Sequence, residues 1–381
     1  MNKQGNIPTI VVLAYNRPEP LSRLLGSLLR AEYGAGQVPL IISLDHDPHP
    51  EVLHLAKSFD WPHGNKQINV SDKPLGTRAH VLQCGDLTDQ YESVIILEDD
   101  LLVSPYFYTY SLEALHFCKS DASLAGISLY SYDVREFKHM RFMAMQDGFD
   151  NYYLQLPSSW GQLWTKEWWG EFRGWLDRGE LVSPDIHPAI LDWPEHSWKK
   201  TFISYLVDQD KYFFYPRVSH TTNFGDLGQN HKGEFARYQV PIEMGQRAHR
   251  LCKLEESKAV YDAFFEPVVT DVNRSAWMDQ FPNLEFDLFG DKHRFRDETQ
   301  YVLTTRRVRN VIRTFAATML PLEMNVYMEV EGEGINLAKK ADVDLSKRPM
   351  NPRIHERITG RFSKQRYGIQ YLYQLMKQIR K

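Results

Sequence analysis

Short apolar runs alternate with segments of helical periodicity over the first hundred residues. Residues 10–14 are continuously apolar and rich in β-branched side chains, which is typical of a strand buried on both faces of a parallel sheet. Prolines follow where a helix can begin, and leucines then recur at helical spacing from Leu21 to Leu29. The alternation continues with strands at 40–44, 68–70 and 94–97 and helices near 51–59 and 77–87. This order predicts an α/β domain built on a doubly wound, mostly parallel sheet.

Polar side chains follow three of the predicted strands. They are Asn16 and Arg17, then Asp45, and then the consecutive acids Glu98, Asp99 and Asp100. Ligands bind at the carboxyl ends of the strands in such sheets, so these groups are expected to meet in one crevice. The three acids repel one another at neutral pH, which predicts a cation or several hydrogen-bond donors beside them.

The later part of the chain is organised differently. A further strand is expected at 124–129, an aromatic segment occupies 158–175, and a strand from residue 212 leads into a loop that contains glycines. Beyond about residue 280, the strands expected at 301–304 and 324–330 are separated by the basic run TTRRVRNVIR. We therefore expect three parts: a main α/β domain over 1–270, a small appended unit over 271–345 and a basic tail over 346–381.

The tail carries ten Lys or Arg residues against the single acid Glu356. Its apolar side chains share one helical face, formed by Ile369, Leu372, Tyr373, Met376 and Ile379. A basic amphipathic helix can lie on an anionic membrane surface. It can equally dock on its own domain and keep its charges in water. The pattern leaves both possibilities open.

Composition narrows the class of protein. The length of 381 residues exceeds what one core usually fills, which agrees with a main domain and an appended unit. The net charge of -4 argues against nucleic-acid binding by the whole chain. The three cysteines form no CxxC pair, so neither a disulfide framework nor a zinc site is expected. The N-terminus lacks a signal-peptide pattern and no apolar stretch is long enough to span a bilayer, so a cytoplasmic location is expected.

The acids at 98–100 have the chemistry of a site for a hard divalent cation. Mg²⁺ and Mn²⁺ prefer oxygen ligands, and one or two carboxylates often hold them together with substrate phosphates. Such a metal would offset the charge that develops on a nucleotide diphosphate as its bond to a sugar breaks. The alternative is a solvated acidic turn. The chain has no GxGxxG and no GxxxxGK[ST] motif, which argues against dinucleotide oxidoreductases and P-loop enzymes.

Six segments, in order along the chain, resemble one known family. They are IPTIVVLAYNRP, PLIISLDH, IILEDDLLVSPYFYTY, DASLAGISLY, SSWGQLW and YPRVSHTTNFG, within about residues 7–228. The set is similar to GT-A fold glycosyltransferases of the N-acetylglucosaminyltransferase I type and their bacterial relatives. The resemblance implies a GT-A-like fold and an enzyme that transfers a hexosyl or N-acetylhexosaminyl group from a nucleotide donor with bound Mn²⁺ or Mg²⁺.

The resemblance also implies roles for single residues. Asp100 matches the family's direct metal ligand, and Glu98 and Asp99 would face the donor sugar, the ribose or the acceptor. The residues matched to nucleotide binding are Leu13, Tyr15, Arg17, Asp45, His80 and Asp99.

Two further segments match parts of the family's site. Trp160 and Gly161 match the segment beside the transferred sugar and the acceptor. The loop after Pro216 resembles the family's loop that closes over the bound donor, and Gly225 and Gly228 would allow its movement.

The catalytic base is where the resemblance fails. Inverting transferases of this type need a carboxylate that takes the proton from the attacking hydroxyl. The family has this acid directly after a tryptophan, whereas here Trp198 is followed by Lys199 and Lys200. Glu195 or Asp192 is the expected substitute, and a different stereochemical outcome or a site that binds without turnover are the alternatives. A lysine at this place could instead meet an anionic acceptor or a phosphate.

Two hypotheses on function follow. The first is a metal-dependent glycosyltransferase that moves a sugar from a nucleotide donor, with UDP as the expected carrier, to a bacterial surface or lipid-linked glycan with inversion. The second is a catalytically silent protein that binds sugar nucleotides or glycans. A nucleotidyltransferase shares the acids but would need a glycine-rich, basic loop near its first strand, which NRPEPL lacks. The expected partners are the donor and the saccharide acceptor, no nucleic acid, and an anionic inner membrane face if the tail docks there.

Overall fold

The chain consists of two compact units in the computed structural model, which describes residues 7–34, 36–136, 140–179, 182–226 and 238–346. The first unit comprises Met1–Tyr132 and Gln146–Asn273, and the second comprises Asp133–Met145 and Arg274–Lys381. The segment Asp133–Met145, which falls within the main domain expected over 1–270, is grouped with the second unit. The basic tail lies outside the described residues from 347 onward, so its predicted roles stay predictions.

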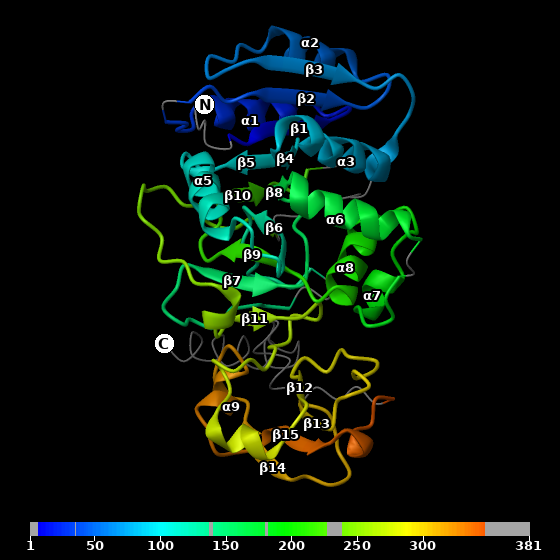
Figure 1. Ribbon diagram of the computed structural model, residues 1–381, viewed down its shortest axis with the longest axis vertical. Helices are drawn as coiled ribbons and strands as arrows, with labels where there is room; N and C mark the ends of the chain where they lie inside the picture. Colours follow the sequence, from blue (N-terminus) through cyan, green and yellow to red (C-terminus); the bar gives the residue numbers. More distant parts are fainter. Residues whose placement is uncertain (1–6, 35, 137–139, 180–181, 227–237, 347–381) are drawn as a thin grey trace, which may run out of the picture. The chain divides into compact units, whose positions relative to one another are not determined.

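The first unit is built on a nine-stranded sheet (Figure 1). The strands lie in the order β11 (Val260–Tyr261), β7 (Asn151–Leu154), β9 (Tyr212–Pro216), β6 (Leu124–Ser128), β8 (Gln162–Thr165), β4 (Ser93–Glu98), β1 (Thr9–Ala14), β2 (Leu40–Leu44) and β3 (Lys66–Val70). Most neighbouring strands are parallel, and β8 and β7 run antiparallel to their neighbours β4, β6 and β9. The predicted α/β class with a large, mostly parallel sheet is confirmed.

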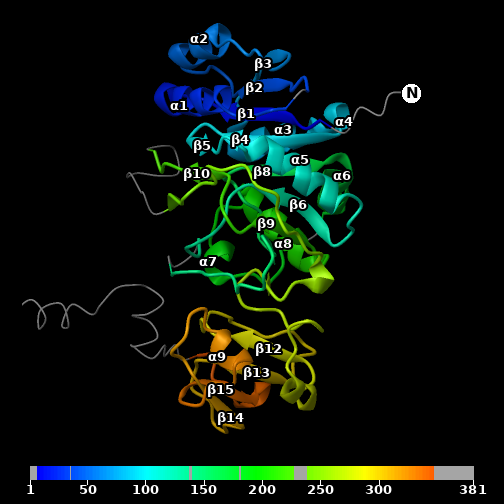
Figure 2. The ribbon, with the colours of Figure 1, turned by 90° about the vertical axis from the view of Figure 1, so that its left-hand side faces the viewer.

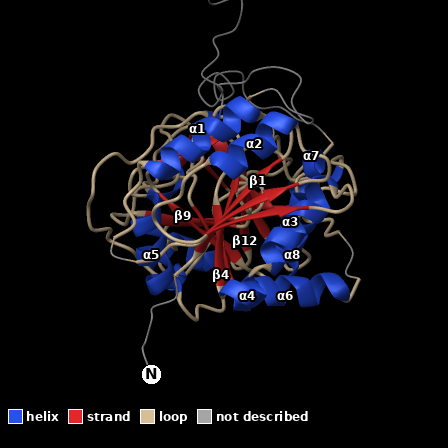
Figure 3. Ribbon diagram, turned by 90° about the horizontal axis from the view of Figure 1, so that it is seen from above, coloured by secondary structure: helices blue, strands red, loops and turns tan. Residues whose placement is uncertain are grey.

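Helices cover both faces of this sheet. They are α1 (Pro18–Leu29), α2 (Pro50–Ser58), α3 (Gly76–Asp86), α4 (Thr88–Tyr91), α5 (Phe107–Cys118), α6 (Lys166–Asp177), α7 (Pro188–Leu191) and α8 (Trp198–Asp208), with a 3₁₀ turn at Leu254–Glu256. Figure 3 shows α1 and α2 on one side of the strands and α3, α6 and α8 on the other. Right-handed crossovers require this division, because the chain runs from β1 to β3 in one direction and then returns past β1 to β4.

The return of the chain makes a switch point between β1 and β4. Leu13 near the end of β1 is in register with Glu98 at the end of β4 on one side and with Ser43 of β2 on the other. Ligand crevices in such sheets lie where the strand order reverses, at the carboxyl ends of the strands, which here are β1 and β4.

A small two-stranded ribbon lies beside the main sheet (Figure 2). It pairs β5 (Leu101–Val103) with β10 (Thr221–Asn223) in antiparallel fashion, with Asn223 opposite Leu101. Because β5 begins directly after the three acids, the ribbon fixes residues near 223 beside the end of β4.

The aromatic segment around α6 is mostly core. Trp164, Trp168 and Trp169 are buried, and Trp164 stacks on Phe202 of α8 with 5.7 Å between ring centroids. Gly85 of α3 is needed for this packing, because a Cβ there would lie 2.2 Å from the Trp169 ring. On α1, by contrast, Leu29 is 44% exposed, so the buried stripe of that helix ends at Leu28.

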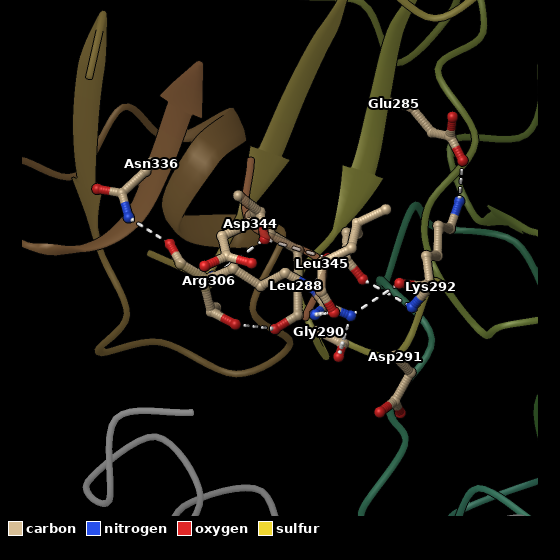
Figure 4. Close-up of polar contacts among 12 residues, drawn as sticks. Glu285, Leu288, Gly290, Asp291, Lys292, Arg306, Asn336, Asp344 and Leu345 are labelled. Carbon is tan, nitrogen blue, oxygen red and sulfur yellow. Dashed lines mark hydrogen bonds and ion pairs between the residues drawn. The ribbon is translucent and has the colours of Figure 1, made fainter. Parts of the chain in front are cut away.

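The second unit has a four-stranded sheet in the order β12 (Leu284–Asp287), β13 (Tyr301–Thr304), β15 (Gly334–Lys339) and β14 (Arg313–Ala316). It also contains 3₁₀ turns at Ala276–Gln280 and Lys340–Asp342. Polar contacts around β12 and β13, which include the pair of Lys292 with Glu285, tie its loops to the sheet (Figure 4).

The prediction of a strand at 324–330 is wrong, because the structure has the short helix α9 (Met324–Tyr327) there. The buried Asn325 side chain explains the difference. Its Oδ1 accepts hydrogen bonds from the backbone N–H groups of Thr318 and Met319, and its Nδ2 donates to the carbonyl groups of Met319 and Leu322. These bonds hold the segment against the preceding turn, and the unpredicted strand β15 lies between β13 and β14 in the sheet.

Two simpler expectations concern the cysteines and the membrane. Cys84, Cys118 and Cys252 are all buried free thiols. Among the helices that the structure describes, none has the length and apolar character needed to cross a bilayer.

Candidate functional site

A cavity of about 180 Å³ lies at the carboxyl ends of β1, β2 and β4, next to the start of α3. Its lining contains most of the residues that the sequence analysis singled out, namely Leu13, Tyr15, Arg17, Asp45, His80, Glu98, Asp99, Asp100 and Trp160. The lining is completed by Ala14, Asn16, Gly76, Thr77, Val81 and Asn223, which include residues that the motifs did not indicate. Gly161, Asp192 and Glu195 are not among the lining residues.

The three acids stand where β4 ends and the chain turns into β5. Asp99 and Asp100 are each only 4% exposed. Both are paired with Arg17, which precedes α1: its Nη1 donates to Asp100 Oδ2 at 3.1 Å, and its Nη2 donates to Asp99 Oδ1. The register of Leu13 with Glu98 explains this meeting, because it sets the loop after β1 beside the loop after β4.

Glu98 and Asp99 have raised pKa values because they are buried close to other acids. Burial, followed by repulsion from Asp100, raises the pKa of Glu98 to about 8, although Arg17 and Lys199 act in the opposite direction. Burial also raises the pKa of Asp99 to about 6 against the attraction of Arg17. For Arg17, burial lowers the pKa but the facing carboxylates outweigh it, so the pKa lies above its ordinary value. A further cation would therefore stabilise the ionised cluster.

Asp100 has the acceptor that a metal ligand needs. Its Oδ1 atom is buried and makes no hydrogen bond in the described part of the chain, while its Oδ2 receives Arg17. In that same part, no group of three His, Cys, Asp or Glu side chains forms a ready-made metal site. A hard cation held by one carboxylate and completed by substrate phosphates needs no such group. The residues present fit Mg²⁺ or Mn²⁺ in this form.

Asp45 and His80 shape the wall opposite the acids. Asp45 accepts hydrogen bonds from the backbone N–H groups of His46, Leu75 and Gly76, so it ties the loop after β2 to the start of α3. Burial raises the pKa of Asp45, but these bonds hold it below its ordinary value. His80 Nε2 lies 2.8 Å from Ser43 Oγ, and burial lowers its pKa, so the ring is neutral. Both residues are thus fixed by the scaffold before any ligand arrives.

Trp160 lines the cavity, and Gly161 positions it. Trp160 is 7% exposed and packs against Tyr130 and Tyr238, with ring centroids at 4.7 and 4.5 Å. Gly161 has φ of +96°, and a Cβ there would lie 2.9 Å from Thr221 Cγ2. Thr221 Oγ1 also donates to the carbonyl group of Trp160. The glycine therefore allows the indole-bearing turn to lie against β10.

The two lysines after Trp198 have different surroundings. Lys200 donates to the carbonyl groups of Leu191 and Trp193 at 2.6 and 3.0 Å and so anchors the end of α7. Lys199 is 4% exposed, donates to Tyr132 Oη at 3.3 Å and lies 5.4 Å from the Trp160 ring centroid. The positive charge of Lys199 acts to lower the pKa of Glu98, which lines the cavity, so this charge lies near the cavity.

The expected substitutes for the base lie elsewhere in the first unit. Asp192 caps the end of α7, and Glu195 follows in the turn before α8; both are exposed. The backbone carbonyl of Glu195 accepts a hydrogen bond from Arg78. The structure does not bring either carboxylate into the lining of the cavity. Their role as base stays a prediction.

The segment after β10 is attached to the acid cluster. The N–H of Phe224 donates to the carbonyl group of Asp100 at 3.1 Å. Arg23 of α1 lies 3.9 Å from the Phe224 ring centroid and is ion-paired with Asp226. Gly225 has φ of +65°, as a turn at this place requires, and Gly228 lies outside the described residues. Asn223 enters the site through the β5–β10 pairing, which the sequence alone did not reveal.

Comparison with known proteins gives one curated relative, and no protein-family model matches the chain. The relative is an alpha-1,3-mannosyl-glycoprotein 2-beta-N-acetylglucosaminyltransferase from Arabidopsis thaliana, 23% identical over 267 residues, which are 64% of this chain and 53% of that protein. The chain therefore spans about half the length of this relative. The match confirms the resemblance to the N-acetylglucosaminyltransferase I type, and the name of the relative agrees with the predicted enzyme class.

Solved structures of glycosyltransferases are also similar to the chain. S. aureus TarS 1-349 in complex with UDP-GlcNAc is 11% identical with a TM-score of 0.39, over 58% of this chain and 60% of that chain. GalNAc-T7 with UDP, GalNAc and Mn²⁺ is 9% identical with a TM-score of 0.42, over 58% and 44%. At these TM-scores the likenesses carry no argument about the site.

Proposed function

We propose that this chain is a metal-dependent glycosyltransferase that moves a sugar from a nucleotide donor, with UDP as the carrier, to a glycan or lipid-linked acceptor with inversion. One observation carries the proposal: Arg17, Asp45 and the three acids from the ends of β1, β2 and β4 line one cavity at the switch point of the sheet. The curated relative, which is named as a transferase of N-acetylglucosamine, supports it.

The residues divide into a nucleotide side and a sugar side. On the nucleotide side we assign Leu13, Tyr15, Arg17, Asp45, His80 and Asp99. Asp45 and His80 are fixed by bonds to the scaffold and can present a rigid wall to a base and ribose. On the sugar side we assign Glu98 and Trp160, whose indole offers an apolar face to a pyranose ring. Gly161 contributes indirectly, because it allows the turn that positions Trp160.

Asp100 is the residue that would hold the divalent cation, through its unpaired Oδ1. When bound, the metal would neutralise negative charge on the leaving diphosphate. An acceptor hydroxyl attacks the anomeric carbon, the bond from that carbon to the phosphate oxygen breaks, and the nucleoside diphosphate leaves with the electron pair. The proton of the hydroxyl passes to a carboxylate, for which Glu195 and Asp192 remain the candidates.

A silent binding protein is the second candidate, and a specific observation favours it. The position after Trp198 holds the buried cation Lys199 beside Trp160, where the family has its catalytic acid. A protonated lysine is a poor base, so such a site could bind a donor without transferring its sugar.

Hydrolysis of nucleotide sugars separates the two candidates. The full chain is incubated with UDP-N-acetylglucosamine, UDP-glucose, UDP-galactose and GDP-mannose, and release of nucleoside diphosphate is measured with Mn²⁺ and with EDTA. We expect slow, Mn²⁺-dependent release from a UDP-sugar. Asp100→Asn should lower it by about 10²–10³-fold, whereas the control Asp89→Asn, at a surface carboxylate whose side chain is 80% exposed, should not. Donor binding without release from any substrate would favour the silent protein.

The cytoplasmic location, the bacterial glycan acceptor and a peripheral membrane attachment belong to the same proposal. The attachment is tested by flotation with anionic liposomes of the full chain and of a variant that ends before Ser346. Equal flotation of the two proteins would remove the membrane role from the tail.

A further inference from the structure

Arg17 is bonded to the carboxylate that would hold the metal ion, through the oxygen Oδ2 next to Oδ1 of Asp100. Its two terminal nitrogens donate to different carboxylates, Nη1 to Asp100 and Nη2 to Asp99, so a single guanidinium bridges both acids. The Arg17 side chain is 21% exposed and the acids are 6% exposed, which makes this a largely buried ion pair. Oδ1 of Asp100 is a buried oxygen of this cluster that makes no hydrogen bond in the described part of the chain.

A divalent cation and Arg17 cannot both hold the cluster in the arrangement seen here. A cation on Asp100 would lie beside the guanidinium charge, and like charges at this distance in a buried site repel strongly. The cation must therefore bind against Arg17 or displace it. Displacement is unfavourable while the guanidinium has no other anion within reach, because it would lose two charge-assisted hydrogen bonds.

A nucleoside diphosphate supplies that other anion. Arg17 lines the same cavity as Asp45 and His80, the residues assigned to the nucleotide, and a guanidinium fork matches the oxygens of a phosphate as well as it matches carboxylates. A diphosphate in the cavity would draw Arg17 from Asp100 and at the same time offer ligands to the metal.

We propose that Arg17 is a built-in competitor of the metal, which keeps the divalent cation off Asp99 and Asp100 until a nucleoside diphosphate draws its guanidinium away. Metal and nucleotide then bind cooperatively, and by linkage each raises the affinity of the other by the same factor. This inference rests on the proposed function, since it assumes that the cavity takes a nucleotide and a metal.

Arg23 provides a matched control on the same helix. It carries the same charge and is also ion-paired, but its partner is Asp226 and its guanidinium lies over the Phe224 ring. The N–H of Phe224 donates to the carbonyl group of Asp100, so Arg23 lies in the neighbourhood of the cluster, while its own ion pair is with Asp226. Removal of Arg23 therefore reports the general effect of losing one positive charge.

The test is calorimetric titration of the full chain with Mn²⁺, with and without saturating UDP, at constant pH and ionic strength. For the wild type we expect UDP to tighten Mn²⁺ binding by about 5–150-fold. Arg17→Gln should tighten Mn²⁺ binding without UDP by at least about fivefold and should shrink the effect of UDP. Arg17→Lys, which keeps the charge but cannot bridge two carboxylates, should give an intermediate gain. Arg23→Gln should stay within about twofold of the wild type.

Each outcome counts for or against a different claim. If Arg17→Gln binds Mn²⁺ alone no better than the wild type does, or if Arg23→Gln gains as much, the competitor role is overturned while the metal site stands. If the wild type takes up no Mn²⁺ even with UDP, the proposed function itself fails. Thermal unfolding of each variant shows whether it is folded, and Arg17→Lys decides the question if Arg17→Gln is not.

Discussion

A buried ionic cluster in the second unit and the acid cluster of the first unit differ in how completely their charges are paired. In the second unit, Asp287 Oδ2 accepts from Arg306 Nε at 2.7 Å and from Thr304 Oγ1 at 3.2 Å, and Oδ1 accepts from the N–H of Lys292. The other Arg306 nitrogens donate to carbonyl groups, among them those of Gly290 and Lys292 (Figure 4). Every charge there has a partner of opposite sign or a carbonyl group.

The acid cluster of the first unit lacks this balance. Asp99 and Asp100 share the single guanidinium of Arg17, and one buried oxygen of Asp100 has no hydrogen bond among the described residues. The paired aspartates of both clusters are buried, so burial alone does not mark a ligand site. Excess charge of one sign beside a cavity does, because the protein leaves it to be completed by something else.

The largest effect is expected from removing the positive partner in the fully paired cluster of the second unit. Arg306→Met leaves the buried Asp287 charge without its guanidinium and should lower the free energy of unfolding by about 3–5 kcal/mol. Urea unfolding followed by tryptophan fluorescence and circular dichroism measures it. Arg307→Met, at an exposed neighbour, should change it by less than about 0.5 kcal/mol. A loss below about 1 kcal/mol for Arg306→Met would contradict the structural role given to this cluster.

The acid cluster of the first unit, whose charges are not fully paired, should lose little or no stability on substitution. Asp100→Asn removes one of three repelling acids, so the free energy of unfolding should stay within about 1 kcal/mol of the wild type or rise. Mn²⁺-dependent release of UDP from its sugar should fall by about 10²–10³-fold. The same unfolding titration and a coupled assay for UDP give the two numbers. Strong destabilisation by this substitution would mean that the acids support the fold rather than a ligand.

A third prediction concerns the buried base His220. Burial, with His249 and Arg247 nearby, lowers the pKa of His220 to about 3, and the ring stacks on Tyr110 with centroids 4.0 Å apart. The unfolded chain takes up a proton below about pH 6.5 and the folded chain does not, so this group removes stability as the pH falls. Relative to His220→Phe, the wild type should lose about 1.4 kcal/mol per pH unit between about pH 6.5 and 3. A difference between the two proteins that does not change with pH would refute the neutral buried ring.

The smallest expected effect concerns the helix that carries Lys199. Ser197 caps α8, since its Oγ accepts from the N–H of Lys200 at 3.3 Å. Ser197→Ala should lower the free energy of unfolding by about 1 kcal/mol without changing Mn²⁺ affinity. If Ser197→Ala changed Mn²⁺ affinity more than stability, this cap would belong to the metal site and not only to the scaffold.

The sequence was most informative where one physical rule decides the structure. Apolar runs of strand length and leucines at helical spacing predicted the elements from β1 to β4, and the switch-point rule predicted that Arg17, Asp45 and Asp100 would meet. The resemblance added His80 and Trp160, which do line the cavity.

Other features depend on contacts that no local pattern reveals. The helix α9 follows from the bonds of one buried amide, that of Asn325. Asn223 reaches the cavity because β10 pairs with β5, and Lys199 differs from Lys200 only through the groups around each. Each of these outcomes is set by residues far away in the sequence or by a single polar side chain, so periodicity does not report them.

The most direct test of the account is whether the excess negative charge at the end of β4 takes up a divalent cation. Titration of the full chain with Mn²⁺ in the presence of UDP should show saturable binding of one ion, and Asp100→Asn should abolish it while the protein stays folded. Binding that persists unchanged in Asp100→Asn, or no binding to the wild type at millimolar Mn²⁺, would contradict the metal site on which the proposed function depends.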